Sequence, residues 1–580
     1  PPKEEPLPRL AVTLTSPSAT VHTNSRVTVE VAVSGGQAEK VELMVGEQVL
    51  ASSSTAPYTF TWDTVSSAEG AYVLWARATA SEETFHSTPR LAVVDRTPPV
   101  LLSQVPAAGE LVDESQPTLT LTFSEPLLPS SVQASRIDVG DVRPAVSARL
   151  SADGRTLTLQ GAADLPRPGR LYAFADSSGL TDLAGNPVGT LRAVDARLVP
   201  RWKDQAPVLN VVGGQLQSNG PVLALDASST AYVSWAEKVS PLSSSRGAYV
   251  ARLGATSWQQ LGGRIGKNGL AMQSAPSLVI DSTGAPLVAF AEWNDAGDDT
   301  KSWVYRWNGT SWVNLGGPLD VYPGGLKYTA NVALAMLGTA PVLAWVESNG
   351  DRHELFVRRW DGATWQALGG ALTTGSESVM AGYHAHDLSL IPDARGGLLL
   401  AWAMGDESSS ESAIHVARYS QGSWERLWPA LNARPGSHVE SPALAVDAQG
   451  SPCVVWLESG DDVRAARWRP GMGWEPLGDQ VNEGAAYGVS TPTLVVRNGV
   501  PIVAWSQLHI DAVAVQVRSY DPLFRRWIPW MKPLSALPNT PGPSNALDPW
   551  LAVDSAGTFL VAFTEHGAFG EGGIRLFKPE

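Results

Sequence analysis

The chain has 580 residues, of which 43% are hydrophobic and 17% charged, and it carries a formal net charge of −15 and one cysteine. These values exclude a single hydrophobic core and an intrachain disulfide. They also argue against nucleic acid as a partner, because phosphates attract clusters of Lys and Arg. No apolar run reaches the roughly 18 residues that a membrane-spanning helix needs.

Residues 1–9 form a polar, proline-rich tether that begins Pro-Pro-Lys-Glu-Glu-Pro. Such a tether is expected after a cleaved signal peptide or a lipidated cysteine. We therefore expect an extracellular protein, or one on a bacterial cell surface, with an outer-membrane lipoprotein as one form. A lipidated N-terminus, rather than a transmembrane segment, would hold it to the membrane. Cys453 lies in an apolar run and is expected to be a small buried hydrophobe.

Residues 10–95 alternate apolar and polar side chains with the period of half-buried strands, as at 27–33 and 40–45. Turn residues recur at short spacing, which is typical of a small β-sandwich. The run Ala-Pro-Tyr-Thr-Phe-Thr-Trp-Asp-Thr at 56–64, followed by Tyr-Val-Leu-Trp-Ala at 72–76, resembles the Ig-like modules of bacterial secreted enzymes and adhesins. The resemblance implies an Ig-like sandwich over 10–95.

Residues 96–198 contain Leu-Thr-Leu-Thr-Phe-Ser-Glu-Pro at 119–126 and Asp-Leu-Ala-Gly-Asn-Pro at 182–187. These segments resemble, at the family's usual spacing, the Ig-like domain named after bacterial surface-layer proteins. The resemblance implies a second sandwich that serves as a spacer on an exported protein. Glu125 and Asp182 are interpreted as turn and cap residues rather than as ligands.

Residues 199–580 contain an internal repeat with a period of roughly 54 residues. One anchor is a tryptophan followed three residues later by Leu-Gly. It occurs at Trp258, Trp312, Trp365 and Trp474, with weaker copies at Trp424 and Trp527. The second anchor is an aromatic residue in an apolar strand, and it occurs at Trp235, Phe290, Trp345, Trp402, Trp456, Trp505 and Phe563. Each unit predicts four strands, a to d, which is the pattern of a propeller blade.

Seven copies predict a seven-bladed β-propeller, and the repeat resembles those of bacterial surface lipoproteins. The last copy ends after strand c, and a strand-d-like piece, Pro-Arg-Trp-Lys at 200–203, precedes the first strand a. We predict that this piece completes the last blade and so removes free sheet edges. The expected fold class is all-β, with two Ig-like sandwiches followed by a propeller that an N-terminal strand closes.

Most of the 22 tryptophans lie on repeat positions and are expected to pack between blades. Those off the repeat are the better candidates for stacking on a ligand: Trp293, Trp303, Trp428, Trp530 and Trp550. Five blades carry a further ligand-binding candidate, a glutamate two residues after the strand-b aromatic: Glu237, Glu292, Glu347, Glu458 and Glu565. Strand c carries a repeated arginine, which predicts cross-strand Glu–Arg ion pairs. A carboxylate ring that binds cations is the alternative.

The b–c and d–a connections are longer and more variable than the other turns, so the face that carries them is the expected binding face. Candidate metal ligands on it are Asp295, Asp298, Asp299, His384 and His386. Carboxylates suit calcium, and the His-Ala-His pattern suits zinc. No complete ligand set can be assigned. We therefore expect no cofactor, with calcium as the alternative.

No nucleophile elbow, metalloprotease motif or phosphate-binding loop occurs. We therefore expect a non-catalytic extracellular binding or adhesion protein, in which an Ig-like stalk presents a propeller that binds a glycan or a surface protein. Two alternatives stay open. One is a secreted polysaccharide-acting enzyme, either a glycoside hydrolase or a lyase. The other is a structural subunit of a surface appendage or envelope complex.

Overall fold

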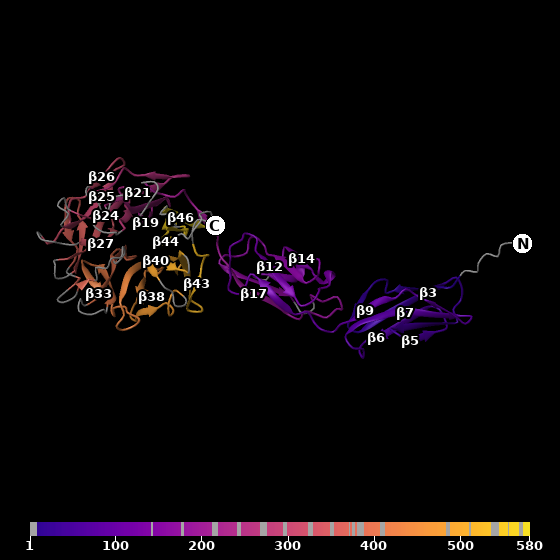
Figure 1. Cartoon of the computed structure of the whole chain (residues 1–580). Helices are drawn as coiled ribbons and strands as arrows, with labels where there is room; N and C mark the ends of the chain where they lie inside the picture. The colour runs from indigo at the N-terminus through magenta and orange to yellow at the C-terminus, as the bar shows by residue number, and fades with distance from the viewer. Residues whose placement is uncertain are drawn as a thin grey trace. The chain divides into compact units, whose positions relative to one another are not determined.

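The computed structural model describes residues 9–140, 143–175, 179–211, 218–240, 245–266, 275–293, 299–322, 329–348, 353–369, 372–373, 378–379, 388–405, 412–482, 488–509, 512–534, 545–554, 556–567 and 572–580. Contacts divide the chain into two compact units, Pro1–Val199 and Pro200–Glu580. Both consist of β-strands, which confirms the all-β class (Figure 1). Among the described residues two short 3-10 helices occur, η1 (Pro129–Ser131) and η2 (Ala134–Arg136). Neither is long and apolar enough to cross a membrane.

The first unit begins with a β-sandwich. Its strands are β1 (Ala11–Ser16), β2 (Val21–Thr23), β3 (Arg26–Ser34), β4 (Lys40–Val45), β5 (Gln48–Ser53), β6 (Tyr58–Asp63), β7 (Gly70–Ala80), β8 (Glu83–His86) and β9 (Arg90–Val94). One sheet has the order β1-β3-β6 and the other the order β2-β9-β7-β4-β5, with β8 paired to β7. In β3 every second residue is buried, so Val27, Val29 and Val31 join Trp62 and Leu74 in the core between the sheets.

A second sandwich follows in the same unit. Its strands are β10 (Leu101–Val105), β11 (Leu111–Val112), β12 (Thr118–Phe123), β13 (Ile137–Val139), β14 (Ser147–Leu150), β15 (Thr156–Gln160), β16 (Gly169–Ala175) and β17 (Leu191–Leu198). They form two sheets with the orders β10-β12-β15-β14 and β11-β17-β16-β13. The alternating run in β12 buries Leu119, Leu121 and Phe123 in the core.

The second unit contains seven sheets among its described residues, numbered here in chain order. Sheets 1 to 3 are β19 (Ser218–Leu225), β20 (Ala231–Lys238), β21 (Arg246–Leu253) and β22 (Trp258–Gln260); β23 (Ser277–Ile280), β24 (Pro286–Trp293), β25 (Thr300–Trp307) and β26 (Trp312–Asn314); and β27 (Thr329–Leu337), β28 (Ala340–Ser348), β29 (His353–Trp360) and β30 (Trp365–Ala367). Within each sheet, strands a to d follow one another in antiparallel order.

The remaining sheets repeat this order. Sheets 4 and 5 are β31 (Ser378–Val379), β32 (Leu388–Pro392), β33 (Leu398–Gly405), β34 (Ser412–Ser420) and β35 (Ser423–Arg426); and β36 (Val439–Val446), β37 (Pro452–Glu458), β38 (Asp462–Arg469) and β39 (Gly473–Pro476). Sheets 6 and 7 are β40 (Val489–Arg497), β41 (Val500–Leu508), β42 (Val513–Asp521) and β43 (Arg526–Pro529); and β44 (Asn545–Val553), β45 (Phe559–His566), β46 (Gly572–Pro579) and β18 (Trp202–Asp204). In sheet 4 both β31 and β32 pair with strand b.

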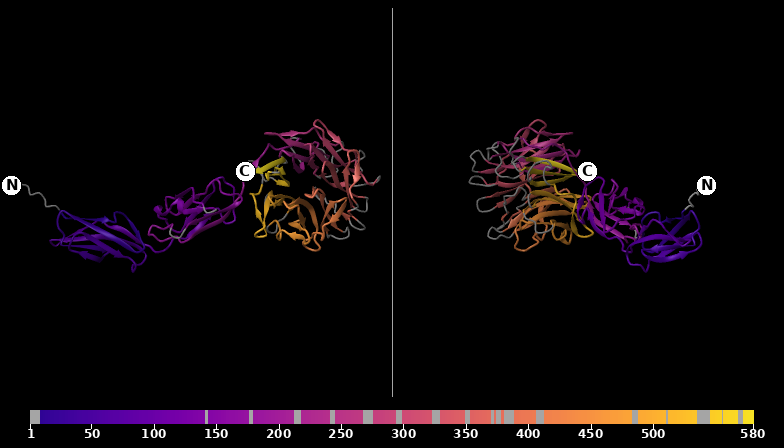
Figure 2. Two further views of the ribbon diagram at one scale, coloured as in Figure 1. Left: turned by 180° about the vertical axis from the view of Figure 1, so that it is seen from behind. Right: turned by 45° about the vertical axis from the view of Figure 1, so that its right-hand side comes forward.

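The seven sheets form a closed ring. The innermost strand of each sheet contacts the innermost strands of its two neighbours, and β44 of sheet 7 contacts β19 of sheet 1. Strand β18 pairs with β46, with Trp202 opposite Pro579, so the two ends of the unit share one sheet. This pairing confirms the predicted closing strand. The second unit is a β-propeller, and its sheets surround a central axis (Figure 2).

Each outer tryptophan is hydrogen bonded to the sheet before it. The indole N–H donates to a backbone carbonyl in the pairs Trp312–Leu261, Trp365–Leu315, Trp424–Leu368, Trp474–Leu427, Trp527–Leu477, Trp202–Lys532 and Trp258–Pro207, at 2.6 to 3.1 Å. Glycine follows the leucine because the next sheet's indole lies against it. A Cβ on Gly369 would be 2.6 Å from Cδ1 of Trp424. These contacts explain why tryptophan and Leu-Gly repeat together.

The second strand of each sheet is covered on both faces, which explains its continuous apolar run. All seven residues of β37 are buried, including Cys453. Burial raises the pKa of the Cys453 thiol to about 11, so the thiol is protonated at neutral pH. This agrees with its predicted role as a small buried hydrophobe.

Candidate functional site

A pocket of about 430 Å³ lies at the centre of the ring. The innermost strands of all seven sheets contribute to its wall, which is mainly aliphatic, with Leu278, Leu334 and Leu444 from sheets 2, 3 and 5. Every described residue that lines it is uncharged. The size and apolar lining are those of a small-molecule site.

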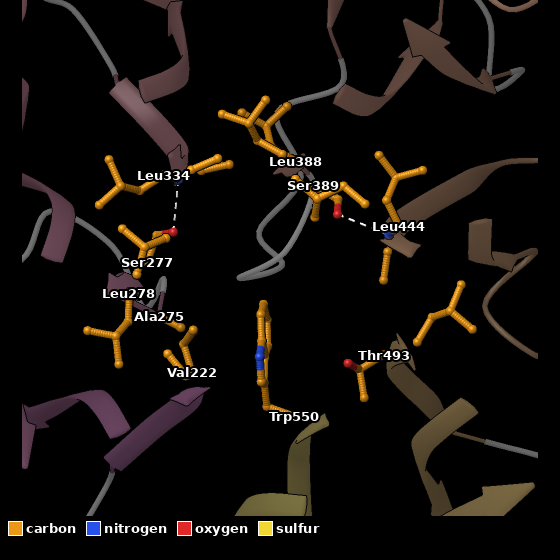
Figure 3. Close-up of a pocket in the computed structure, with 18 of the residues that line it drawn as sticks. Val222, Ala275, Ser277, Leu278, Leu334, Leu388, Ser389, Leu444, Thr493 and Trp550 are labelled. Carbon is orange, nitrogen blue, oxygen red and sulfur yellow. Dashed lines mark hydrogen bonds between the residues drawn. The ribbon is translucent and has the colours of Figure 1, made fainter. Parts of the chain in front are cut away.

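Trp550 projects into this pocket from β44. Figure 3 shows its indole near the middle of the ring, between Val222 on one side and Thr493 on the other. The side chain is half-buried and packs partly against the cores of sheets 1 and 2. An aromatic surface is therefore held inside the pocket by its neighbours.

Three hydroxyls of the wall connect adjacent sheets. Ser277 Oγ accepts the N–H of Leu334 at 2.9 Å, and Ser389 Oγ accepts the N–H of Leu444 at 3.0 Å (Figure 3). Thr493 Oγ1 accepts the N–H of Leu551 at 3.5 Å. A hydroxyl has one proton and two lone pairs, so each oxygen that accepts one N–H can still donate to a ligand. The wall thus combines apolar surface with fixed hydroxyl donors.

Five of the innermost strands have a residue with a left-handed backbone near their start. The left-handed φ values are 40° at Gly220, 50° at Asn331, 51° at Ser441, 45° at Thr491 and 52° at Asp548, and each coincides with a register shift in its strand pair. Asp548 accepts the Thr491 hydroxyl at 3.3 Å and the Gly220 N–H at 3.4 Å, which links sheets 6, 7 and 1. Strain of this kind persists where the surroundings fix it, and it clusters at functional sites.

The five strand-b glutamates do not face an open site. Their exposed fractions are 0% at Glu237, 2% at Glu292, 1% at Glu347, 0% at Glu458 and 4% at Glu565. Glu347 accepts the N–H groups of Val321 and Tyr322, which belong to the d–a connection, and the indole N–H of Trp345. Burial raises the pKa of Glu347. Glu237 and Glu458 accept N–H groups of a d–a connection in the same way, from Val211 and Arg434. All five glutamates are buried, so their prediction as ligand-binding residues is corrected.

The predicted pairing of the repeated glutamate with the repeated arginine is wrong in sheets 2 and 5, and sheet 4 has Met404 in place of the glutamate. In all three sheets the repeated arginine pairs with the aspartate of the a–b turn: Arg306 with Asp281 at 2.7 Å, Arg418 with Asp393 at 2.9 Å and Arg467 with Asp447 at 3.5 Å. The register explains the difference, because Arg306 stands opposite Leu287 whereas Glu292 stands opposite Lys301. In sheets 5 and 7 a Glu–Arg pair does form, but with an arginine nearer the b–c end: Glu458 with Arg464 at 3.7 Å, and Glu565 with Arg575 at 2.7 Å.

The five tryptophan candidates do not converge on one site. Trp550 lines the pocket, whereas half-buried Trp293 ends β24 and Trp303 stands opposite Phe290 in sheet 2. Trp530 is 4% exposed and packs on Phe559, so its prediction as a ligand contact is corrected. Trp530 lies three residues after Trp527, the position at which other sheets have a buried leucine, so its burial could have been predicted from the sequence. Trp428 is 57% exposed on the outer side of sheet 4.

Four metal candidates, Asp295, Asp298, His384 and His386, lie outside the described residues. Asp299 lies 3.5 Å from Lys301 Nζ.

Three carboxylates of the first unit lie close together, although no sequence pattern connects them. Among the described residues, the oxygen atoms of Asp95, Glu125 and Asp182 lie within 4.8 Å of one another. Asp182 caps its own turn by accepting the N–H groups of Ala184 and Asn186, as predicted. Burial and, next, the Asp95 charge raise the pKa of Glu125 to about 7.

Residues 11–76 match the family described as a bacterial Ig domain, and residues 95–194 match the family described as a bacterial Ig-like domain. The first unit therefore contains two bacterial Ig-like domains. No curated protein matches the chain.

Solved structures similar to this chain include carbohydrate-binding and carbohydrate-active proteins. A protein of unknown function from Dyadobacter fermentans is 12% identical, with 66% of this chain and 100% of that chain covered and a TM-score of 0.39. An ulvan lyase is 12% identical, with coverage of 63% and 95% and a TM-score of 0.43. The Aleuria aurantia lectin is 15% identical, with coverage of 54% and 97% and a TM-score of 0.35. The assignment as a propeller rests on the sheet order and the closed ring of inner strands.

Proposed function

We propose that this chain is an extracellular, non-catalytic carbohydrate-binding protein whose propeller binds a neutral glycan in its central pocket. The observation that carries the proposal is Trp550, an indole held half-buried in a pocket of about 430 Å³ with an uncharged described lining. The apolar face of a sugar ring matches the face of an indole, and sugar hydroxyls match serine and threonine hydroxyls.

A neutral glycan fits the described lining better than an acidic one. A uronate or sulfate in this pocket would lose its hydration without meeting a lysine or arginine from the described wall. Burying an unpaired charge is costly. A neutral sugar would need only apolar contact and hydroxyl partners, which Trp550, Ser277 and Thr493 supply.

The carboxylates favour binding over hydrolysis. Glycoside hydrolases generally place two carboxyl groups on either side of the bond that they cleave. No described residue of the pocket wall is acidic, and the repeated glutamates are buried outside that wall. These observations support a receptor rather than a hydrolase or lyase.

Bacterial Ig-like domains are typical of extracellular and surface proteins, which supports display of the propeller outside the cell. Adhesion to a surface glycan, and anchoring of the proline-rich N-terminal segment by a lipid, are the finer parts of the proposal. Metabolic labelling with a fatty-acid analogue tests the anchor. A lipidated chain incorporates the label, and a chain released without it contradicts this part.

Calorimetric titration of the full chain with neutral oligosaccharides tests the proposed function. Arabinan, galactan, xylan and glucan fragments form the panel, and uronate oligomers form the charged comparison. We expect binding of a neutral member and its loss in Trp550→Ala. Trp293→Ala, which removes a half-buried indole outside the pocket wall, is the matched control and should bind normally. Release of new reducing or unsaturated chain ends would show turnover and contradict a purely binding role.

A further inference from the structure

Sheet 4 breaks the repeat at one outer position. In four sheets the residue after the anchoring leucine is a glycine with a left-handed backbone: Gly262, Gly316, Gly369 and Gly478. A Cβ at these glycines would approach the next sheet to between 2.6 and 3.2 Å. Sheet 4 has Trp428 at this position, directly after Leu427. Sheets 6 and 7 have Met531 and Ala206 there, so sheet 4 carries the largest side chain at this position, on a backbone that is not left-handed.

Packing between sheets does not account for Trp428. At the outer edge, sheet 5 contacts sheet 4 through Trp474, whose indole N–H donates to the carbonyl of Leu427 at 3.1 Å. The Trp428 side chain remains 57% exposed. Exposing a large aromatic surface forfeits the favourable free energy of its burial. A contact with a partner outside the chain would recover it.

Neighbouring groups hold the Trp428 indole in place. The Arg426 guanidinium lies 5.8 Å from the Trp428 ring and 5.6 Å from the ring of buried Trp402. His415, 8% exposed, is 5.8 Å from Trp428 at an interplanar angle of 85°, and it stacks on Trp402 at 5.6 Å. A side chain fixed before binding loses little conformational freedom on contact with a ligand. The exposed indole is therefore a preformed surface.

We propose that Trp428 forms a second glycan-binding site, on the outer side of sheet 4, where the apolar face of a neutral sugar ring stacks on the exposed indole. Trp428 is absent from the described lining of the central pocket, so the two sites are separate. A polysaccharide could then contact the ring at its centre and at its rim, which strengthens binding through effective concentration.

The test compares full-length variants by affinity electrophoresis through gels that contain arabinan, galactan, xylan or glucan. Trp428→Gly introduces the residue found at this position in sheets 1, 2, 3 and 5 and should fold like the parent chain. We expect it to bind the polysaccharide roughly thirty-fold more weakly, as for truncation of an aromatic hot spot. Trp428→Phe should retain most of the affinity. Phe524→Gly is the matched control, because Phe524 is also exposed, at 64%, and has the Arg526 guanidinium 5.2 Å from its ring.

Unchanged migration of Trp428→Gly on every polysaccharide that the parent chain binds would overturn the proposal, and so would a parent chain that binds none. If the glycine variant unfolds, Trp428→Leu is tested in its place, and full affinity of that variant would also overturn the proposal. The central pocket is judged separately. Loss of binding in Trp550→Ala with none in Trp428→Gly supports the pocket and rejects the rim site, whereas the reverse result supports the rim site and rejects the pocket.

Discussion

Replacing Gly369 by alanine should destabilise the propeller through a contact that can be isolated. Gly369 has φ 79°, a conformation that costs an alanine about 1–2 kcal/mol. Its new Cβ would also lie 2.6 Å from Cδ1 of Trp424. That indole cannot move away freely, because its N–H donates to Leu368 at 2.8 Å and its ring packs 5.2 Å from Tyr419. Overpacking of this kind costs about 1–3 kcal/mol, so we expect a total loss of about 2–5 kcal/mol.

Gly284→Ala is the control for the backbone. Gly284 has φ 82°, and a Cβ added there would have no atom within 4 Å, so only the conformational cost applies. Urea unfolding of both variants, followed by tryptophan fluorescence, should place Gly369→Ala about 1–3 kcal/mol below Gly284→Ala. Equal free energies of unfolding in the two variants would refute the reasoning that the next sheet's indole dictates the glycine.

Three further predictions concern single side chains. Glu125 keeps a proton up to about pH 7 in the folded chain but releases it near 4.5 when unfolded, so stability should fall as the pH rises between these values. Glu125→Gln should remove that fall in urea midpoints, and an unchanged pH dependence would contradict it. Met404→Gln should stabilise the propeller by about 1 kcal/mol by giving the buried Trp402 indole an acceptor. Trp402 Nε1 has no hydrogen-bond partner among the described residues, whereas the equivalent indole of sheet 6 donates to a glutamine. A lower urea midpoint for the variant would argue against this. Trp202→Ala should destabilise the ring by about 3 kcal/mol, since it removes a contact with Phe559 and the bond that ties the closing strand to sheet 6; calorimetry of the propeller transition checks it.

The architecture was readable from sequence because its periodic signals arise from packing that every sheet shares. The tryptophan and Leu-Gly anchors mark one hydrogen bond and one close approach, repeated around the ring. Strand b is apolar throughout because neighbouring sheets cover both of its faces. The closing strand was predictable because Trp202 carries the same anchor as the other outer strands.

The pairing of charges was less predictable. The sequence gives the order of side chains along each strand, but it does not give the register between adjacent strands. Arg306 and Glu292 are on adjacent strands, yet the register separates them, and the aspartate of the a–b turn is nearer. The N–H groups that hold Glu347 come from a connection with no pattern of its own.

The site was predictable only in part. Trp550 was singled out because it lies off the repeat, and it does line the pocket. The same criterion selected Trp530, which fills the buried leucine position of sheet 6. The strained residues at the start of the inner strands gave no distinct signal, because glycine, asparagine, serine, threonine and aspartate all occupy that position.

A crystal structure of the full chain, grown with the neutral oligosaccharide that binds most tightly in titration, would locate the bound sugar. We expect density for it inside the ring of inner strands, with one face of a pyranose or furanose against the Trp550 indole and hydroxyls near Ser277, Ser389 or Thr493. A bound sugar located away from this wall, with no density inside the ring, would contradict the proposed site.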